Sequence, residues 1–304
     1  MDLKGKIVFS SGQVGDYDIW SVDLATKEVK QLTSGPYWND CPKWSPDGKK
    51  IIFVSNRTGT PEIWVMDEDG ANQSPITSKG RWHNTPDWTP DGEKIVFCAN
   101  YGGDIDDIYI MNLDGSGLEQ ITNYKGMDYT PQFAPNHKKI IFTSHRSGND
   151  DIWTYHLETK EFKQLTDYKG KDSSPTYSPD GKLIAFVSEF KPVLGEENSE
   201  IFLMNSEGKD RRRITHNLGA DNHVSWSPDG KFLIYTSNRP QSSVERLMIM
   251  ELEKMKKEKI DFSRDSLNKE IGFEYPKPWG LFKFIPPSVY KKLYSEEFFQ
   301  RLFL

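Results

Sequence analysis

The sequence repeats a short motif about every 44 residues. In each copy, an aromatic residue precedes Ser-Pro-Asp-Gly or a close variant of it. The copies begin at Ser45, Thr89, Ala134, Ser178 and Ser227, and successive copies are separated by 44, 45, 44 and 49 residues. A unit of this length cannot bury an apolar face alone, so a regular repeat predicts a fold in which neighbouring units pack against one another.

Each repeat contains short segments typical of β-strands. The motif is followed by an apolar segment such as residues 51–54 and then by a second one such as residues 62–66. Runs rich in Ile, Val and aromatic residues between turn residues indicate strands, and Pro-Asp-Gly indicates a turn because Pro presets φ and Gly tolerates positive φ. Together with a strand before the motif and another near a closing Leu/Ile-Thr pair, each repeat predicts four strands.

Four-stranded units of this length favour a β-propeller, which is an all-β fold. The second strand occurs six times, because residues 6–10 align with the five later copies. The sequence therefore predicts a six-bladed β-propeller of four-stranded antiparallel blades. A parallel solenoid is the alternative, but its coils are usually shorter than these repeats.

The ends of the chain are expected to close the propeller. The sequence starts inside a blade, without the first strand of that blade. Residues 259–262 are a candidate fourth strand for the last blade, and we expect residues 270–284 to supply the missing first strand, so that both termini join the sheets and no edge stays open. Residues 1–286 then form the propeller. Residues 287–304 carry apolar residues at helical spacing and predict a short C-terminal helix, either packed on or beside the propeller or docking a partner.

Composition excludes several classes of protein. The chain has 304 residues with 39 Lys and Arg against 45 Asp and Glu, a net charge of −6, and only 2 Cys. Two cysteines cannot form a disulfide scaffold, and mild acidity disfavours nucleic-acid binding, which needs a basic surface. No apolar run approaches the length of about 18 residues that a membrane span needs. The chain also lacks a Gly-x-Ser-x-Gly motif, and its 6 His show no recognised ligand spacing, so the sequence assigns no catalytic residue and no metal site.

One end of the blades is expected to carry the binding site. In antiparallel blades the loops after the second and fourth strands lie at the same end, and these loops vary in length. Ser55 and Glu62 are separated by 6 residues, whereas Ser188 and Glu200 are separated by 11. Insertions confined to one end of a repeat protein usually mark its binding face.

At that end a polar position recurs three residues before the proline of the first strand or its equivalent. It is occupied by Asn39, His83, Asp128, Asp172 and Asp221. We expect these side chains to form a wet ring around the central channel, where they either cap the loops or bind a ligand. The predicted ligand-binding set also includes Trp38, Trp82, Tyr129 and His223. The three successive aspartates would favour a cation, an amine or a basic segment.

Arg57, Arg146 and Arg239 recur in the loop after the second strand. A residue that repeats with the fold is most simply explained by the fold, so we expect each arginine to pair within its own blade with the acidic residue that opens the third strand. The alternative is that some of them point inward and bind an anion. Acidic turns such as residues 149–151 are expected to be solvated and not to bind calcium.

The repeat as a whole resembles that of the TolB-type propellers. The shared features are Pro-x-aromatic-Ser-Pro-Asp-Gly-Lys, Ser-Asn-Arg, Asp/Glu-Ile-Trp and Leu/Ile-Thr, and the likeness covers residues 6–252. It implies a non-catalytic protein that binds a protein segment, such as a peptidoglycan-associated lipoprotein, or a saccharide at the loop-rich face around the channel. Tyr37 and Tyr101 would be further aromatic anchors there. The resemblance implies no cofactor, although a divalent cation such as calcium would fit the channel.

The resemblance also sets expectations for location and for a competing function. TolB-type propellers are mostly periplasmic or exported, so we expect such a location, with a leader absent from this chain; a cytoplasmic protein is the alternative. TolB itself has an N-terminal α/β domain, for which we expect no counterpart here. The competing function is a polysaccharide lyase or another glycan-cleaving enzyme, in which His83, His223 and Asp221 would supply the base or hold a divalent cation.

Overall fold

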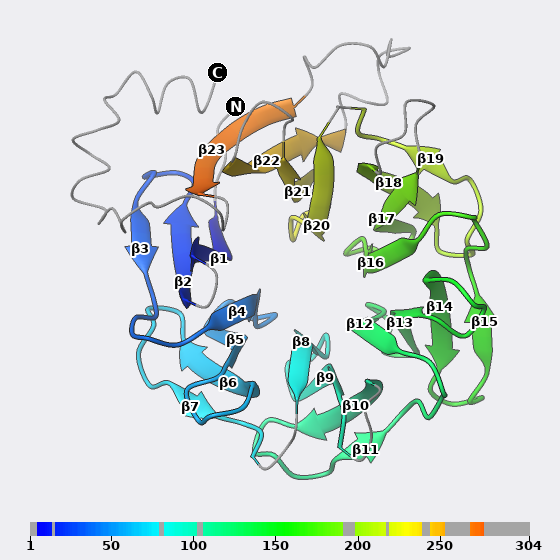
Figure 1. Cartoon of the computed structure of the whole chain (residues 1–304), viewed down its shortest axis with the longest axis horizontal. Coiled ribbons are helices and arrows are strands. Elements are labelled where there is room, and N and C mark those ends of the chain that lie inside the picture. Colours follow the sequence, from blue (N-terminus) through cyan, green and yellow to red (C-terminus); the bar gives the residue numbers. More distant parts are fainter. Residues whose placement is uncertain are drawn as a thin grey trace. The chain divides into compact units, whose positions relative to one another are not determined.

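The computed structural model describes residues 5–13, 16–78, 82–101, 106–190, 198–216, 219–238, 244–252 and 268–276. These residues form six antiparallel sheets, which confirms the predicted all-β fold, a six-bladed β-propeller (Figure 1). The chain divides into two compact units, residues 1–133 and residues 134–304. Within the described residues, no helix has the length and hydropathy needed to cross a membrane.

The first unit holds three sheets and the strand that begins the fourth. The first sheet has the order β1 (Lys6–Gln13), β2 (Asp16–Asp23) and β3 (Val29–Gln31). The second consists of β4 (Asn39–Trp44), β5 (Lys50–Ser55), β6 (Glu62–Asp67) and β7 (Ser74–Pro75). The third consists of β8 (His83–Trp88), β9 (Lys94–Ala99), β10 (Asp107–Asn112) and β11 (Glu119–Gln120). The fourth begins with β12 (Asp128–Phe133), and β8 contacts both β4 and β12.

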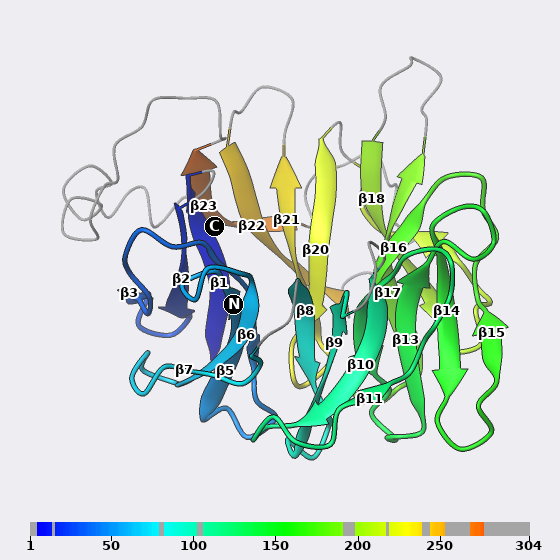
Figure 2. The same cartoon turned by 60° about the horizontal axis from the view of Figure 1, so that its bottom comes forward.

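The second unit continues the fourth sheet with β13 (Lys139–Ser144), β14 (Asp151–His156) and β15 (Phe162–Gln164). The fifth sheet consists of β16 (Asp172–Tyr177), β17 (Leu183–Phe190), β18 (Asn198–Asn205) and β19 (Arg212–Arg213). The sixth consists of β20 (Ala220–Trp226), β21 (Phe232–Asn238), β22 (Val244–Glu251) and β23 (Asn268–Pro276). Figure 2 shows these strands lengthwise, and neighbours within a sheet run in opposite directions.

Apolar side chains of neighbouring sheets pack together in the core, and in the second to fifth sheets the second strand is the most buried element. In β5, for example, Ile51, Ile52 and Phe53 are completely buried. A completely buried phenylalanine recurs at one position of these strands, as Phe53, Phe97, Phe142 and Phe186. Because both faces of such a strand are covered, its sequence is a continuous apolar run instead of an alternating one.

The Ser-Pro-Asp-Gly motif forms the turn between the first and second strands. Ser45 Oγ lies 2.6 Å from Asp47 Oδ1 and accepts a hydrogen bond from Lys50 N at 2.9 Å. Gly48 has a φ of +70°, in the left-handed region that glycine adopts without steric cost. The two Ser45 contacts recur at Thr89, Ser178 and Ser227. Turn chemistry thus explains why a hydroxyl residue, an aspartate and a glycine recur in the motif.

Each first strand carries a bulge near its start. Equivalent positions with φ between +43° and +54° are occupied by Cys41, Thr85, Thr130, Ser174 and His223. The pairing register shifts here in four sheets, for example between Asp40 and Lys43. A left-handed backbone is unusual for threonine, whose branched side chain is crowded there, so the bulge is a strained feature that its surroundings hold in place.

The C-terminal part differs from the prediction in one respect. β23 pairs with β22 and is therefore the fourth strand of the sixth sheet, not the first strand of the first sheet. β22 and β23 are consecutive strands in the chain, and consecutive strands are usually neighbours in a sheet. In the described residues the first sheet has three strands. The predicted strand at residues 259–262, residues 277–284 and the predicted helix at residues 287–304 lie outside the described residues.

Candidate functional site

The five aligned polar residues of the predicted site lie at or next to the start of the first strands. Asn39, His83 and Asp128 lie in the first unit, Asp172 and Asp221 lie in the second, and none of them has exposed surface. The expectation that these side chains form a wet ring is therefore wrong. Buried polar groups need hydrogen-bond partners, so the fold has to supply those partners from within the protein.

Asn39 links two sheets of the first unit. Its Nδ2 donates to Asp18 Oδ1 of β2 at 3.2 Å, and its Oδ1 accepts a hydrogen bond from the Arg57 guanidinium at 2.7 Å. Asp18 also accepts a hydrogen bond from Thr33 Oγ1 at 2.9 Å. The guanidinium of Arg57 lies 4.6 Å from the ring centroid of Trp64. Arg57 thus pairs within its own sheet, but its partner is the residue that opens the first strand, not the acidic residue that opens the third.

His83 takes the place of Asn39 in the third sheet. Its Nδ1 lies 3.0 Å from Glu62 Oε2, and its Nε2 lies 2.7 Å from the Tyr101 hydroxyl. Burial lowers the pKa of His83 although Glu62 opposes this, so the imidazole is neutral at pH 7; Nδ1 then donates to Glu62 and Tyr101 donates to Nε2. Burial, followed by the charge of Glu62, raises the pKa of Tyr101 to about 12. Tyr101 occupies the repeat position of Arg57. The pair of Asn39 and Arg57 in the second sheet is thus replaced by the pair of His83 and Tyr101 in the third.

Asp172 is held by an arginine that the repeat pattern did not predict. Its two carboxylate oxygens accept hydrogen bonds from the guanidinium of Arg211 at 2.6 and 3.0 Å. In the repeat, Arg211 stands at the position of Gln73, and Phe190 stands at the position of Arg57. Gln73 accepts a hydrogen bond from Arg57, so the positions of Arg57 and Gln73 contact each other. The arginine occupies the first of these positions in the second sheet and the second of them in the fifth sheet. The exchange of Gln73 for Arg211 was a signal in the sequence, but the Ser-Asn-Arg motif alone did not reveal it.

Asp128 and Asp221 complete the set. The backbone N–H of Asp128 donates to Asp106 O at 3.0 Å. Asp221 lies near Glu200, and Arg213 donates to Glu200 Oε1 at 2.5 Å. Burial, with a contribution from the negative charge of Asp221, raises the pKa of Glu200 to about 7, although the hydrogen bond from Thr215 and the charge of Arg213 lower it.

A common pattern connects these contacts. A threonine after the fourth strand accepts a hydrogen bond from the third strand, as Thr77 does from Ile63 N at 2.9 Å, and its hydroxyl donates to a carboxylate such as that of Glu62. That carboxylate in turn reaches the polar residue of the next sheet. Asn39 and His83 therefore hold neighbouring sheets together, whereas Asp172 is held by an arginine of its own sheet. The role of the five residues in ligand binding stays a prediction. The negative potential expected from the aspartates is offset at Asp172 by Arg211.

The side chains that face solvent stand one residue before the buried ones. In the first unit these are Trp82 and Met127, which are exposed, and Trp38, which is half-buried. Trp82 is 43% exposed, Met127 is 50% exposed, and the ring centroids of Trp38 and Trp82 lie 6.4 Å apart. Tyr37 and Tyr124, from the same loops, are exposed as well. We call these five residues the apolar loop surface.

The two units differ at the position of Trp38, Trp82 and Met127, although Tyr168 of the second unit, which aligns with Tyr124, is 48% exposed. Lys171 and Ala220 stand at the corresponding positions of the second unit. The sequence pointed to Trp38 and Trp82 but not to Met127, although its place before Asp128 in the aligned repeat was a usable signal. Large apolar side chains that gather at one exposed place are typical of interaction sites.

Hydrogen bonds hold the backbone of both tryptophans. Trp38 N donates to Asn56 Oδ1 at 2.8 Å, and Asn56 N donates to Trp38 O at 3.2 Å. Asn100 N donates to Trp82 O at 3.2 Å in the same way. Because the backbone is fixed before binding, less conformational entropy is lost when a partner covers the surface.

The remaining predicted residues lie apart in the chain. Tyr129 is half-buried in the first unit, whereas His223 is exposed in the second, where its Nδ1 lies 3.1 Å from Thr236 Oγ1. Of the residues that a lyase would use, His83 and Asp221 are buried and only His223 is exposed. Across the described ranges, no three or more His, Cys, Asp or Glu residues are grouped so that they could hold a metal ion.

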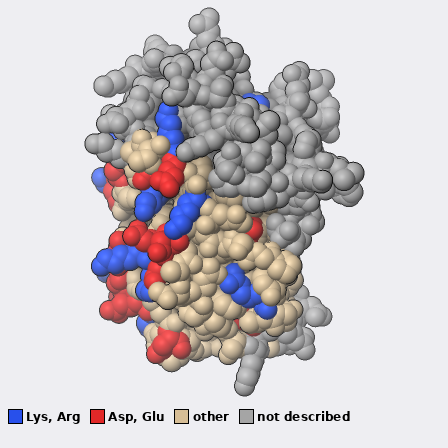
Figure 3. Space-filling view, turned by 90° about the vertical axis from the view of Figure 1, so that its left-hand side faces the viewer, with Lys and Arg blue, Asp and Glu red and all other residues tan. Residues whose placement is uncertain are grey.

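Charged side chains of both signs mix on the side of the molecule shown in Figure 3. Lys and Arg alternate with Asp and Glu along one margin, and wide areas carry neither. Pairs of this kind in the first unit include Lys6 with Glu68 at 3.4 Å and Lys50 with Asp67 at 3.1 Å. The described part of this side therefore presents no continuous basic surface of the kind that nucleic-acid binding needs.

The family model of the TolB beta propeller domain matches residues 4–115 and 65–192, which together exceed half of the chain. The chain belongs to the TolB beta-propeller family. A second model, that of the Tricorn protease N-terminal beta propeller domain, matches residues 147–269. The resemblance expected from the repeat is thereby confirmed for this TolB-family propeller.

Solved structures share this TolB-family fold. TolB from Acinetobacter baumannii is 28% identical, with a TM-score of 0.71 over 83% of this chain and 62% of that chain. The putative TolB from Agrobacterium tumefaciens is 21% identical, with a TM-score of 0.68 over 81% of this chain and 86% of that one. An oligogalacturonate lyase in complex with manganese is 15% identical, with a TM-score of 0.56 over 89% and 74%, and shows the fold alone. The chain thus spans less than two thirds of the Acinetobacter protein, and a search of the curated proteins finds no match.

Proposed function

We propose that this TolB-family propeller is a binding protein that holds a protein segment on its apolar loop surface. The observation that carries the proposal is the pair of tryptophans, Trp38 and Trp82. Their ring centroids lie 6.4 Å apart, Trp82 is exposed, and the backbone of both residues is held by hydrogen bonds. Tryptophan and tyrosine provide large contact areas at a small entropy cost and are enriched among the residues that dominate binding energy.

The buried polar residues have an indirect part in this function. Asn39 and His83 follow directly after the two tryptophans, and their contacts with Asp18 and Glu62 fix the start of β4 and β8. Preorganised loops bind better than loops that must be ordered by the partner. Asn39 and His83 thus act as positioning residues for the tryptophans.

The partner and its location follow from the family resemblance. We propose a peptidoglycan-associated lipoprotein as the first partner to test and a periplasmic site of action. A saccharide ligand would also use exposed aromatic rings, and it is therefore the competing outcome of the test.

The test is an affinity measurement with two protein variants. The periplasmic domain of a peptidoglycan-associated lipoprotein, and peptides selected from a random display library on the wild-type protein, are titrated against the wild type, W38A/W82A and L118A. Leu118 is the matched control, because it is 48% exposed in the turn between β10 and β11 of the same unit. We expect W38A/W82A to weaken binding at least about tenfold and L118A to leave it unchanged. Equal affinities for all three proteins would refute the proposal.

A further inference from the structure

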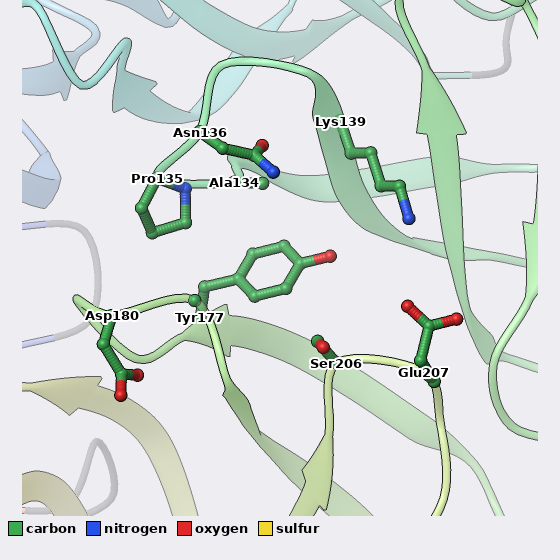
Figure 4. Close-up of a pocket in the computed structure, with 9 residues that line it drawn as sticks. Ala134, Pro135, Asn136, Lys139, Tyr177, Asp180, Ser206 and Glu207 are labelled. Carbon is green, nitrogen blue, oxygen red and sulfur yellow. The ribbon is translucent and has the colours of Figure 1, made fainter.

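The second unit contains a pocket at the end of its strands that carries the Ser-Pro-Asp-Gly-type turns. Its volume is about 370 Å³, at the small end of the range of about 300–1,000 Å³ that is typical of ligand sites. Its walls include Pro135, Asn136, Lys139, Tyr177 and Glu207 (Figure 4). The loops after the second strands lie at the opposite end of the same strands, so this pocket is separate from the binding function proposed above.

The pocket lies where the sequence departs from its own repeat. Tyr177 stands at a position that is tryptophan in three other repeats, as Trp44, Trp88 and Trp226. The indole N–H of Trp88 donates to Lys43 O, and that of Trp226 donates to Thr176 O, each at 3.1 Å. A tyrosine ring is smaller than an indole, so the exchange leaves space between the turns.

The turn across the pocket departs from the repeat as well. Ala134 replaces the Ser or Thr that opens the motif in the other repeats, and Asn136 replaces the aspartate. Ala134 therefore lacks the hydroxyl that binds the aspartate two residues later elsewhere, as Ser45 does with Asp47 at 2.6 Å. In a repeat protein the common residues are explained by the fold, so departures that meet at one pocket indicate a separate role.

Three polar groups of the pocket gather at one end, whereas Asp180 lies at the other. Figure 4 shows the Tyr177 hydroxyl pointing toward the side where the Lys139 ammonium and the Glu207 carboxylate face each other. Lys163 Nζ lies 2.6 Å from Glu207 Oε2, and this hydrogen bond lowers the pKa of Glu207, which keeps the carboxylate ionised at neutral pH. Burial, followed by the charge of Glu207, raises the pKa of Tyr177 to about 12, so the phenol keeps its proton and can donate it.

We propose that this pocket binds a small zwitterion of the α-amino acid class. The ligand carboxylate accepts hydrogen bonds from Lys139 and the Tyr177 hydroxyl, its ammonium pairs with Glu207, and its side chain lies along the Tyr177 ring and Pro135. A neutral ligand between Lys139 and Glu207 would screen the attraction of these two charges and would offer neither of them an opposite charge. A zwitterion replaces that attraction with two ion pairs, so the chemistry of the pocket favours a ligand whose ammonium and carboxylate groups are bonded to the same carbon.

The experiment is calorimetric titration of the full chain with a panel of free α-amino acids, with the N-acetyl and methyl-ester derivatives of those that bind, and with glucose as a neutral control. We expect at least one free amino acid to bind, and each blocked derivative to bind at least about tenfold more weakly. Absence of binding for the whole panel at millimolar concentration, tighter binding of glucose, or equal binding of the blocked derivatives would overturn the proposal.

Two variants locate the binding in the pocket. Y177W restores the residue that the repeat uses elsewhere and fills the space, so we expect it to fold and to lose binding. K139M removes the ammonium and should weaken binding at least about tenfold, whereas K94M changes the equivalent lysine at the start of β9 and should have no effect. Unchanged affinity in both Y177W and K139M would place the ligand elsewhere and contradict the proposal.

Discussion

At the scale of single residues, the position that opens each first strand is occupied by different buried polar side chains in different sheets. Asn39 pairs with Arg57, His83 pairs with Tyr101, and Asp172 pairs with Arg211. In each case the buried polar group and its partner differ together from one sheet to the next. Polarity at the expected end of the blade therefore marked buried contacts within and between sheets, while the large apolar residues of the first unit stood one position earlier.

Glu200 gives the clearest pH dependence among these residues. Its pKa is about 7 in the folded protein, against 4.5 for an unperturbed Glu, because the side chain is buried near Asp221 and only partly balanced by Arg213. Between these two values the folded protein holds a proton that the unfolded chain has lost. The free energy of unfolding should therefore fall as the pH rises from about 4.5 to about 7, by roughly 3 kcal/mol at most.

Urea unfolding of the wild type and of E200Q across this pH range checks the prediction. The neutral amide has no proton to lose, so E200Q should lack the part of the decline that Glu200 causes. E158Q, which changes an exposed residue of the same unit, should follow the wild-type curve. If E200Q and the wild type show the same pH profile, the assigned titration is wrong.

At the scale of elements, polar contacts near the strand ends fasten the first sheet to the second and the second sheet to the third. A threonine after the fourth strand caps the third strand and contacts a carboxylate, and the carboxylate contacts the next sheet. In the second sheet, Arg57 in the loop after the second strand contacts the polar residue that opens the first strand. In the fifth sheet the arginine that makes this contact is Arg211, which directly precedes β19. The contact is preserved although the element that supplies it has changed.

We predict that R211A is strongly destabilising. Removal of the guanidinium leaves the completely buried carboxylate of Asp172 without its two charged hydrogen bonds, and breaking such a pair costs about 3 kcal/mol. R212A removes the neighbouring exposed arginine and should change the free energy of unfolding by less than about 0.5 kcal/mol. Equal effects of the two substitutions in urea unfolding would show that Arg211 does not hold the sheet.

At the scale of the whole molecule, the sequence predicted the fold more completely than the site. The six sheets, the turns and the second strands follow from a repeat whose apolar runs and Pro-Asp-Gly turns act locally, so they can be read without knowledge of tertiary contacts. The role of Asn39 and Asp172 could not be predicted in this way. Their burial depends on which side chains reach them, namely Asp18 of the neighbouring sheet and Arg57 and Arg211 of their own sheets, and those partners lie 18 to 39 residues away in the chain.

The sheet that the C-terminal strand joins was predicted incorrectly for a similar reason. Residues 268–276 have the alternating pattern of a strand, but the pattern does not specify which open edge the strand joins, and β23 joins β22. The residues on which the two proposals rest occupy positions that differ from one repeat to the next. Trp38, Trp82 and Met127 belong to the apolar loop surface of the first unit, and Tyr177 lines the pocket of the second.

The central claim is that the apolar loop surface of the first unit binds a protein segment, and site-specific photo-crosslinking tests it most directly. A benzophenone amino acid is placed at position 82 or 127, or at position 118 as the control, and each protein is irradiated with the display-selected peptide that binds the wild type most tightly. We predict crosslinks from positions 82 and 127 and none from position 118. Crosslinks from position 118 with none from positions 82 and 127 would contradict the claim.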